Sequence, residues 1–98
     1  MTGTRFLPAA EAEFLREIEY YSNAREGLGI RFQLSVMATI GKVVANPSGG
    51  APVRSGTRSR LVKGFPFSIV YRVSDNELLI VAVAHHRRRP EYWAQRIE

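Results

Sequence analysis

Residues 65–96 decide the fold, and they read FPFSIVYRVSDNELLIVAVAHHRRRPEYWAQR. Over residues 65–73 the large apolar side chains occupy every second position, which is the period of a β-strand. Asp75 and Asn76, which tolerate left-handed turn geometry, separate this run from a second apolar run. The stretch therefore predicts a β-hairpin that ends in the basic block at residues 85–90.

The turn sets which residues of the hairpin lie opposite one another. A two- or four-residue loop pairs Val73 with Leu78, and the larger apolar face, which begins at Phe65, should pack on helices. Arg72 and His85 then share a face but lie six residues apart, roughly 20 Å at about 3.3 Å per residue. We therefore expect that they do not form one compact site. The other expected pairs are Tyr71–Ile80, Phe67–Ala84, Arg72–Leu79, Val70–Val81, Ser68–Val83 and Pro66–His85.

The N-terminal part of the chain has the period of a helix. From Ala9 onward, Ala10, Phe14, Ile18 and Tyr21 form one apolar stripe at spacings of four, four and three residues. The proline before this segment fits a first helical turn, where its missing N–H is not needed. The glutamates lie off the stripe, and those near the start favour the positive end of the helix dipole. They are Glu11, Glu13, Glu17 and Glu19.

A second helical segment spans residues 28–45 and ends before Pro47, because the residue before a proline is pushed out of helical space. Gly27 or Gly29 should supply the left-handed conformation that a helix end often needs. Gly41 weakens the second helix by about 1 kcal/mol relative to alanine, unless a close contact needs a small residue. Two such helices predict an antiparallel helical hairpin. The second stripe consists of Leu28, Phe32, Val36, Ile40 and Val43, widened by Met37 and Val44.

The rest of the chain supplies shorter elements. Residues 4–7 are a candidate edge strand, and residues 58–63 are a further strand. Between the helices and the sheet, residues 47–57 form a loop rich in glycine, proline and serine, long enough to be mobile or functional. Pro90 can open a short last helix over residues 91–98. The sequence thus predicts an α+β fold, with the helical hairpin packed on an antiparallel sheet of three or four strands.

Composition narrows the class of protein. The chain has 98 residues, which fit a single domain, residues 1–98. Cysteine is absent, which excludes a disulfide framework and a thiolate metal site or nucleophile. The N-terminus lacks an apolar signal-peptide region, and the longest apolar run, residues 78–84, is far below the roughly 20 residues that span a bilayer. We therefore expect a soluble cytoplasmic protein that makes no contact with a membrane.

The net charge of +5 belongs to the second half of the chain. Residues 1–46 carry five basic and five acidic residues, whereas residues 47–98 carry nine and four. Such a field favours a polyanion or an acidic protein partner, although it also serves as a solubilising surface. The candidate binding residues are Arg58, Arg60, Lys63, Arg72, His85, His86, Arg87, Arg88, Arg89, Tyr92, Trp93 and Arg96.

The basic block at residues 85–90 contains groups that could serve phosphodiester chemistry. Histidine transfers protons near neutral pH, and arginine holds a phosphate through two hydrogen bonds. RNA cleavage needs a base, an acid and cations but no metal, because the 2′-hydroxyl is an internal nucleophile. In the alternative interpretation, one histidine caps the strand and the arginines form a solvated rim.

No metal ion or cofactor is expected. His85 and His86 point to opposite faces of a strand, and no carboxylate lies in their neighbourhood. The chain has no Ser/His/Asp arrangement typical of a catalytic triad, no glycine-rich phosphate-binding loop, and no ligand spacing typical of a zinc site. Tyr92 and Trp93 could stack on a nucleobase, but such residues more often pin a terminal helix to a sheet.

Five motifs follow one another over nearly the full length: PAAEAEFLREIEYY (8–21), GLGIRF (27–32), NP (46–47), RLVKGFPFSIVYRV (60–73) and VAHHRRRPEYW (83–93). In this order the chain resembles the RelE/ParE superfamily of toxins from bacterial type II toxin–antitoxin modules, also called plasmid stabilisation proteins. The resemblance implies a helical hairpin against an antiparallel sheet with a short C-terminal helix. The residues alone predict the same arrangement.

The superfamily divides by target. RelE-like members cut mRNA on the ribosome, whereas ParE-like members inhibit DNA gyrase and lack the nuclease residues. Nuclease members carry an arginine three residues before the tyrosine matched by Tyr71, and this chain has Ser68 there. Two other matches favour a nuclease: His86 matches a catalytic histidine of some nuclease members, and Arg87 or Arg88 matches a phosphate-binding arginine.

The resemblance favours a ParE-like toxin that inhibits gyrase by binding, without catalysis of its own, and forms a hetero-oligomer with a cognate antitoxin. The first alternative is a ribosome-dependent, metal-independent mRNA endonuclease that uses His86, Arg88 and Tyr92. The second alternative is a degenerate, non-toxic member that only binds its antitoxin. The antitoxin is expected to lay an acidic or amphipathic segment against the hairpin and the basic sheet face.

Overall fold

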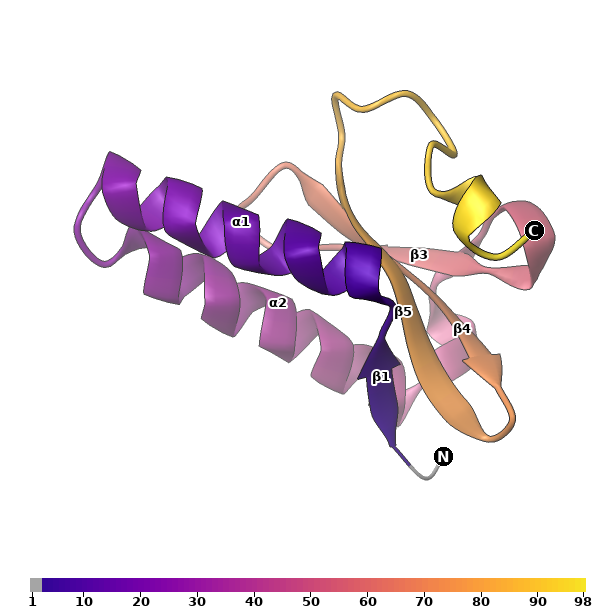
Figure 1. Ribbon diagram of the computed structural model, residues 1–98. Helices are drawn as coiled ribbons and strands as arrows, with labels where there is room; N and C mark the ends of the chain where they lie inside the picture. Colours follow the sequence, from indigo (N-terminus) through magenta and orange to yellow (C-terminus); the bar gives the residue numbers. More distant parts are fainter. Residues whose placement is uncertain (1–2) are drawn as a thin grey trace.

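The computed structural model describes residues 3–98. Helices α1 (Pro8–Ala24) and α2 (Leu28–Ala45) form a hairpin on one face of a five-stranded sheet (Figure 1). The C-terminal segment, drawn in yellow, packs on the other face of the sheet. The predicted α+β fold is confirmed, with the sheet as its middle layer.

Glycine sets both the turn and the closeness of the helical hairpin. Gly27 adopts a left-handed conformation with φ of 80° between the two helices, as one of the two predicted positions. Gly29 has a different role, because it lies where the helices approach each other. A Cβ at Gly29 would clash with the Ser22 side chain and lie 2.7 Å from the Ile18 carbonyl oxygen. The α2 helix covers the residues predicted for it, and α1 begins at Pro8.

The sheet differs from the prediction in strand number and in one strand direction. Its order is β1-β5-β4-β3-β2, and β1 runs parallel to β5 while the other pairs are antiparallel. The predicted edge strand at residues 4–7 is confirmed as β1, but it is parallel to its neighbour, and β2 adds a fifth strand that is too short to show a period. The strands are β1 (Thr4–Phe6), β2 (Ala51–Pro52), β3 (Arg58–Leu61), β4 (Phe67–Ser74) and β5 (Glu77–His85). Short 3-10 turns at Pro47–Gly49 and Arg54–Gly56 flank β2.

The β4–β5 hairpin has the predicted register only near its turn. Tyr71 has its expected partner, but a β-bulge between Val70 and Tyr71 shifts the pairing beyond it by one residue. His85 therefore lies opposite Phe67 and not Pro66, with the two rings 4.8 Å apart. The expected pairs Val70–Val81, Ser68–Val83 and Phe67–Ala84 are replaced by Val70–Ala82, Ser68–Ala84 and Phe67–His85.

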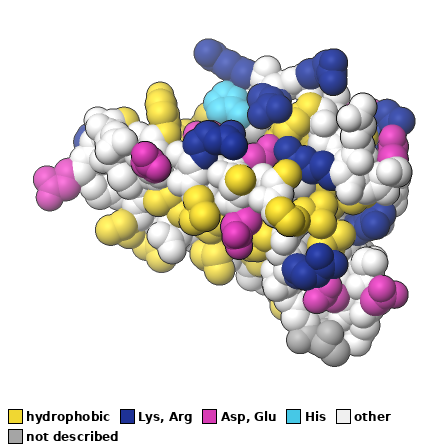
Figure 2. Space-filling view, viewed as in Figure 1, with side chains coloured by type: hydrophobic (Ala, Val, Ile, Leu, Met, Phe, Trp, Pro, Cys, Tyr) yellow, Lys and Arg dark blue, Asp and Glu magenta, His cyan; other side chains and the backbone are white. Residues whose placement is uncertain are grey.

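Two apolar clusters cover the two faces of the sheet. The larger cluster joins the helices to β4 and β5, with Phe32 and Phe67 near its centre. The predicted α2 stripe is narrower than expected, because Met37 and Val44 are 49% and 46% exposed. Figure 2 shows hydrophobic side chains open to solvent along the helical hairpin.

The predicted C-terminal helix over residues 91–98 is not formed. Glu91 has a φ of 60°, which a helix does not allow, and only a 3-10 turn follows at Ala94–Arg96. Trp93 is 4% exposed and packs in the cluster on the outer sheet face. The segment is therefore pinned to the sheet by its aromatic side chain rather than by a helix face.

One helix has the length and composition of a membrane span. Within the described chain, α2 reaches a mean hydropathy of 1.3 over Leu28–Ala45. Its side chains Phe32, Val36 and Val43 are fully buried against the rest of the fold. A core helix passes the same test, so the hydropathy is weak support for a membrane segment.

Candidate functional site

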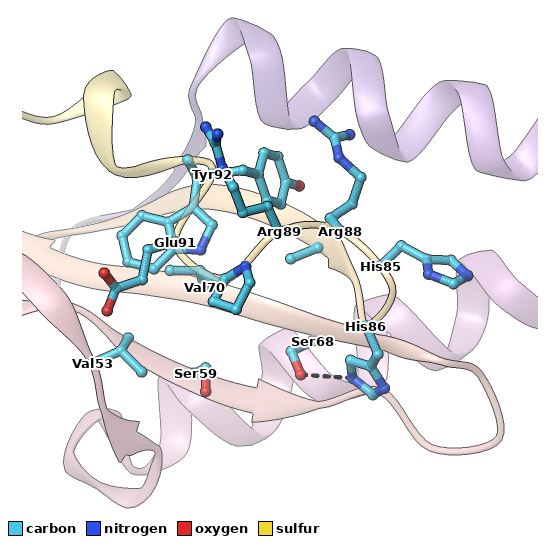
Figure 3. A pocket seen from close by; sticks show the side chains of 13 residues that line it. Val53, Ser59, Ser68, Val70, His85, His86, Arg88, Arg89, Glu91 and Tyr92 are labelled. Atoms are coloured by element: carbon cyan, nitrogen blue, oxygen red, sulfur yellow. Dashed lines mark hydrogen bonds between the residues drawn. The ribbon is translucent and has the colours of Figure 1, made fainter.

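The outer face of the sheet is hollowed beside the C-terminal segment (Figure 3). This outer cavity has a volume of about 310 Å³ and lies over the ends of β3, β4 and β5. Its floor carries small and apolar side chains, and its rim carries part of the predicted basic block. The floor includes Ser59, Ser68, Val70 and Ala84, and the rim includes His86, Arg88, Arg89 and Pro90.

The two adjacent histidines serve different sides of the sheet. His86 is exposed, and its Nε2 lies 3.0 Å from the Ser68 hydroxyl on the cavity floor. Its backbone N–H donates to the carbonyl of Pro66 at 2.9 Å, which extends the hairpin by one residue. His85 packs its ring on Phe67 of the helix-side core while it also borders the outer cavity (Figure 3), and its Nδ1 accepts the backbone N–H of Arg87 at 3.0 Å. The two imidazoles thus make their contacts on opposite faces of the sheet, as predicted.

A buried carboxylate ties α1 to the C-terminal segment. Glu13 is 5% exposed and accepts hydrogen bonds from the N–H of Val83, the hydroxyl of Tyr92 and the guanidinium of Arg96. The two Arg96 nitrogens lie 2.9 Å from its two oxygens. The placement of Glu13 off the buried stripe was thus wrong. The sequence did contain a signal for the burial of Glu13, because this residue lies one turn after Ala10 and so falls at the edge of the apolar stripe.

This cluster fixes the protonation states of its members. Burial alone would raise the pKa of Glu13, but the hydrogen bonds from Arg96, Tyr92 and Val83 outweigh burial and lower it. The hydrogen bond to Glu13 raises the pKa of Arg96. Burial, together with the same carboxylate, raises the pKa of Tyr92. A phenol held in this way is a poor general base near neutral pH, so Tyr92 serves the structure.

Arg88 is held at the rim of the outer cavity by the same tyrosine. Its guanidinium carbon lies 3.9 Å from the centroid of the Tyr92 ring, a cation–π contact. His86 and Arg88 therefore face the same cavity, as the nuclease alternative requires. Arg87 lines a neighbouring hollow beside α1, which shares His85 and His86 with the outer cavity.

Two predicted cations belong to the inner face. Arg58 and Arg60 pair with Tyr71 and Ile69, whose side chains lie in the helix-side core, so all four share that face. The Arg58 guanidinium donates to the carbonyl of Gly50 at 2.9 Å. These arginines support the loop after α2 and lie apart from the outer cavity.

The remaining cations are spread over the molecule. Arg72 pairs with Leu79 near the hairpin turn, so it lies far from His85 as expected, but the expected shared face is wrong because the bulge turns His85 to the helix side. Its Nε is buried and has no hydrogen-bond partner among the described residues. Lys63 is exposed in the turn between β3 and β4. Figure 2 shows a histidine with Lys or Arg side chains around it at the upper edge of this face. The predicted binding residues thus divide among several surfaces.

The chemistry available at the outer cavity follows from these contacts. His86 can exchange a proton and is hydrogen-bonded to the Ser68 hydroxyl, while Arg88 and Arg89 can hold an anionic group. No group of three His, Asp or Glu side chains that could hold a metal ion occurs within residues 3–98. The cavity suits a partner group that is partly apolar and carries negative charge.

Residues 4–90 match the ParE toxin of type II toxin–antitoxin system, parDE. Because this match spans most of the chain, the protein belongs to the ParE toxin family. Among solved structures it is similar to the "Chromosomal ParDE TA system from P. aeruginosa", with a TM-score of 0.72 and 21% identity over 87% of this chain and 95% of that chain. At this identity the likeness shows a common fold. A search of curated proteins finds no match.

Proposed function

We propose that this chain is a toxin that binds and inhibits DNA gyrase and is neutralised by a cognate antitoxin. The observation that carries the proposal is Ser68, which stands where nuclease members of the superfamily have an arginine and hydrogen-bonds His86 instead. Tyr92, the third group of the nuclease alternative, is bound to Glu13. These contacts support a toxin that acts by binding its target and not by catalysis, in keeping with the ParE family.

The direct test uses purified chain, gyrase and relaxed plasmid. We expect loss of supercoiling and an accumulation of cleaved DNA on addition of denaturant. Arg88→Ala/Arg89→Ala should weaken the inhibition because it removes cations from the cavity rim. Arg16→Ala, an exposed change on α1, should leave it unchanged and is the matched control. Full supercoiling in the presence of an excess of folded chain would contradict the proposal.

A second candidate is an mRNA endonuclease. One observation favours it, since His86 is exposed at the cavity with Arg88 and Arg89 on the same rim. Induction of the chain alone in bacteria separates the candidates, because cleavage leaves cut mRNA and gyrase inhibition leaves DNA breaks. His86→Ala should abolish mRNA cleavage, whereas His85→Ala, on the other face, should not. Normal growth at confirmed soluble expression would leave only the non-toxic, antitoxin-binding interpretation.

The antitoxin contact has a candidate surface on α2. Ile30 and Leu34 are each 63% exposed, and with Met37 and Val44 they form an apolar line on the solvent side. The only charged residues of α2 are basic, so an amphipathic segment with acidic flanks would complement this helix. We expect Leu34→Lys to weaken antitoxin binding at least tenfold more than Ala12→Lys, an exposed change on α1. Equal effects of the two changes would exclude α2 as the contact.

A further inference from the structure

A second hollow lies on the helix side of the sheet, between α1 and the end of β5. It has a volume of about 510 Å³, within the range of small-molecule pockets. His85 and His86 line both this hollow and the outer cavity, so the two adjoin, but only this hollow is also lined by Glu17, Tyr20 and Tyr21 of α1. The hollow is lined by Glu17, Tyr20, Tyr21, Pro66, His85, His86 and Arg87.

The hollow follows from the way α1 runs beside β5. Glu13 accepts the N–H of Val83, which fixes the two elements in register at that point. Four helical residues advance about 6 Å and two strand residues advance about 6.6 Å. Glu17 therefore reaches the level of His85, and both side chains line the hollow. At Glu13, hydrogen bonds close the space between α1 and β5. One helical turn later, at Glu17, that space stays open.

Two charged side chains around this hollow are not engaged inside the protein. Within residues 3–98, the side chains of Glu17 and Arg87 form no hydrogen bond or salt bridge. The Nδ1 of His85 accepts a backbone N–H, which assigns its ring proton to Nε2 and leaves that nitrogen as a donor. An acceptor on α1 thus faces donors from the end of β5.

The same hollow has aromatic walls. The rings of Tyr20 and Tyr21 are 5.2 Å apart and nearly perpendicular, at 74°. Tyr21 packs its other side on the ring of Phe65, 5.1 Å away, which holds it in place. Tyr20 is 63% exposed, so its face is open to a ligand. Flat aromatic surfaces beside paired donors and acceptors suit a nucleobase better than an aliphatic group.

We propose that this hollow binds a guanine base. Guanine presents two adjacent N–H donors on one edge and the acceptors O6 and N7 on another. The carboxylate of Glu17 accepts from the first edge, while His85 and Arg87 donate to the second. The base stacks on Tyr20. Adenine fits poorly, because its N1 acceptor would face the carboxylate.

The base can belong to a free nucleotide or to a single-stranded nucleic acid, since both present the same edges. The test titrates GMP and AMP into isotopically labelled chain and follows the amide resonances by NMR. We expect GMP to bind about tenfold more tightly than AMP, with the largest shifts at Glu17 and His85. A short oligothymidine with one central guanine, compared with one central adenine, separates the two sources. Tighter binding than GMP indicates nucleic acid, and weaker binding indicates the nucleotide.

Two variants test whether a preference for GMP over AMP depends on the proposed contacts. Glu17→Gln should reduce the GMP preference below about twofold, because an amide no longer offers two acceptor oxygens. Glu19→Gln, an exposed change on the same helix, should keep the preference. Equal affinity for GMP and AMP, no shifts at millimolar GMP, or an unchanged preference in the folded Glu17→Gln variant would each overturn the proposal.

Discussion

Replacement of Glu13 by glutamine tests the contact that holds the C-terminal segment. The side chains of Glu13 and Arg96 are only 7% and 20% exposed, so Glu13→Gln leaves a partly buried guanidinium without its counterion. Breaking a buried ion pair costs about 3–5 kcal/mol, and the partial exposure of Arg96 lowers our expectation to about 2–3 kcal/mol. For a chain of this length that corresponds to a fall in melting temperature of roughly 10 °C or more.

The assay is urea unfolding followed by circular dichroism, with Glu11→Gln as the matched control. Glu11 is exposed in the first turn of α1, so its replacement should change the free energy of unfolding by less than about 0.5 kcal/mol. In an Arg96→Met background, Glu13→Gln should cost much less, because no buried charge is then left unpaired. Equal costs in both backgrounds would refute the ion-pair argument.

The Glu13 carboxylate makes the free energy of unfolding depend on pH, and its contribution is lost on acidification. The pKa of Glu13 is lowered in the folded state from its ordinary value of 4.5, so the unfolded chain binds the proton more readily. Its contribution is therefore present above about pH 4.5 and is lost as the pH falls through the lower folded value. The stability difference between the natural chain and Glu13→Gln should shrink on acidification, and a constant difference would contradict this assignment.

Three further changes have definite expected outcomes in the same unfolding assay. Gly41→Ala should stabilise the chain by about 1 kcal/mol, because no atom lies within 4 Å of the added Cβ; a loss of stability would contradict this. Gly29→Ala should destabilise by about 1–3 kcal/mol through its clash with Ser22, and an unchanged midpoint would show that the helices can separate freely. Tyr71→Phe should cost about 1–2 kcal/mol and speed proteolysis in residues 47–57, because the hydroxyl bonds two backbone groups there; unaltered cleavage would refute its anchoring role.

The periodic parts of the fold were predictable from the sequence, and the short or singular parts were not. The α2 helix and the hairpin turn follow from side-chain spacing and from turn residues, which act locally. The β-bulge between Val70 and Tyr71 has no local signal, because neither residue is a glycine or a proline. It moved His85 to the helix side, opposite Phe67, so that the histidine lines the hollow beside α1 as well as the outer cavity.

The role of Glu13 was missed for a different reason. Periodicity assigns a residue to the inside or the outside by its type, and a glutamate is placed outside. Its burial depends on Arg96, 83 residues later in the chain, and no local pattern connects the two. The outer cavity was predicted in part, because His86 and the arginines adjoin in the sequence, whereas its floor comes from three separate strands.

The continuous apolar run of β5 explains why the C-terminal segment is where it is. A strand that is apolar at every position, as from Leu78 to Val83, must be buried on both faces. The helices cover one face, so the tail has to cover the other, and Trp93 does this by packing on Val70, Leu79 and Val81 in the outer cluster. Because Glu13 on α1 holds that tail through Tyr92, the wall of the outer cavity depends on a residue on the opposite side of the sheet. Glu13→Gln should therefore disturb the binding of a partner at the outer cavity even under conditions where the fold survives.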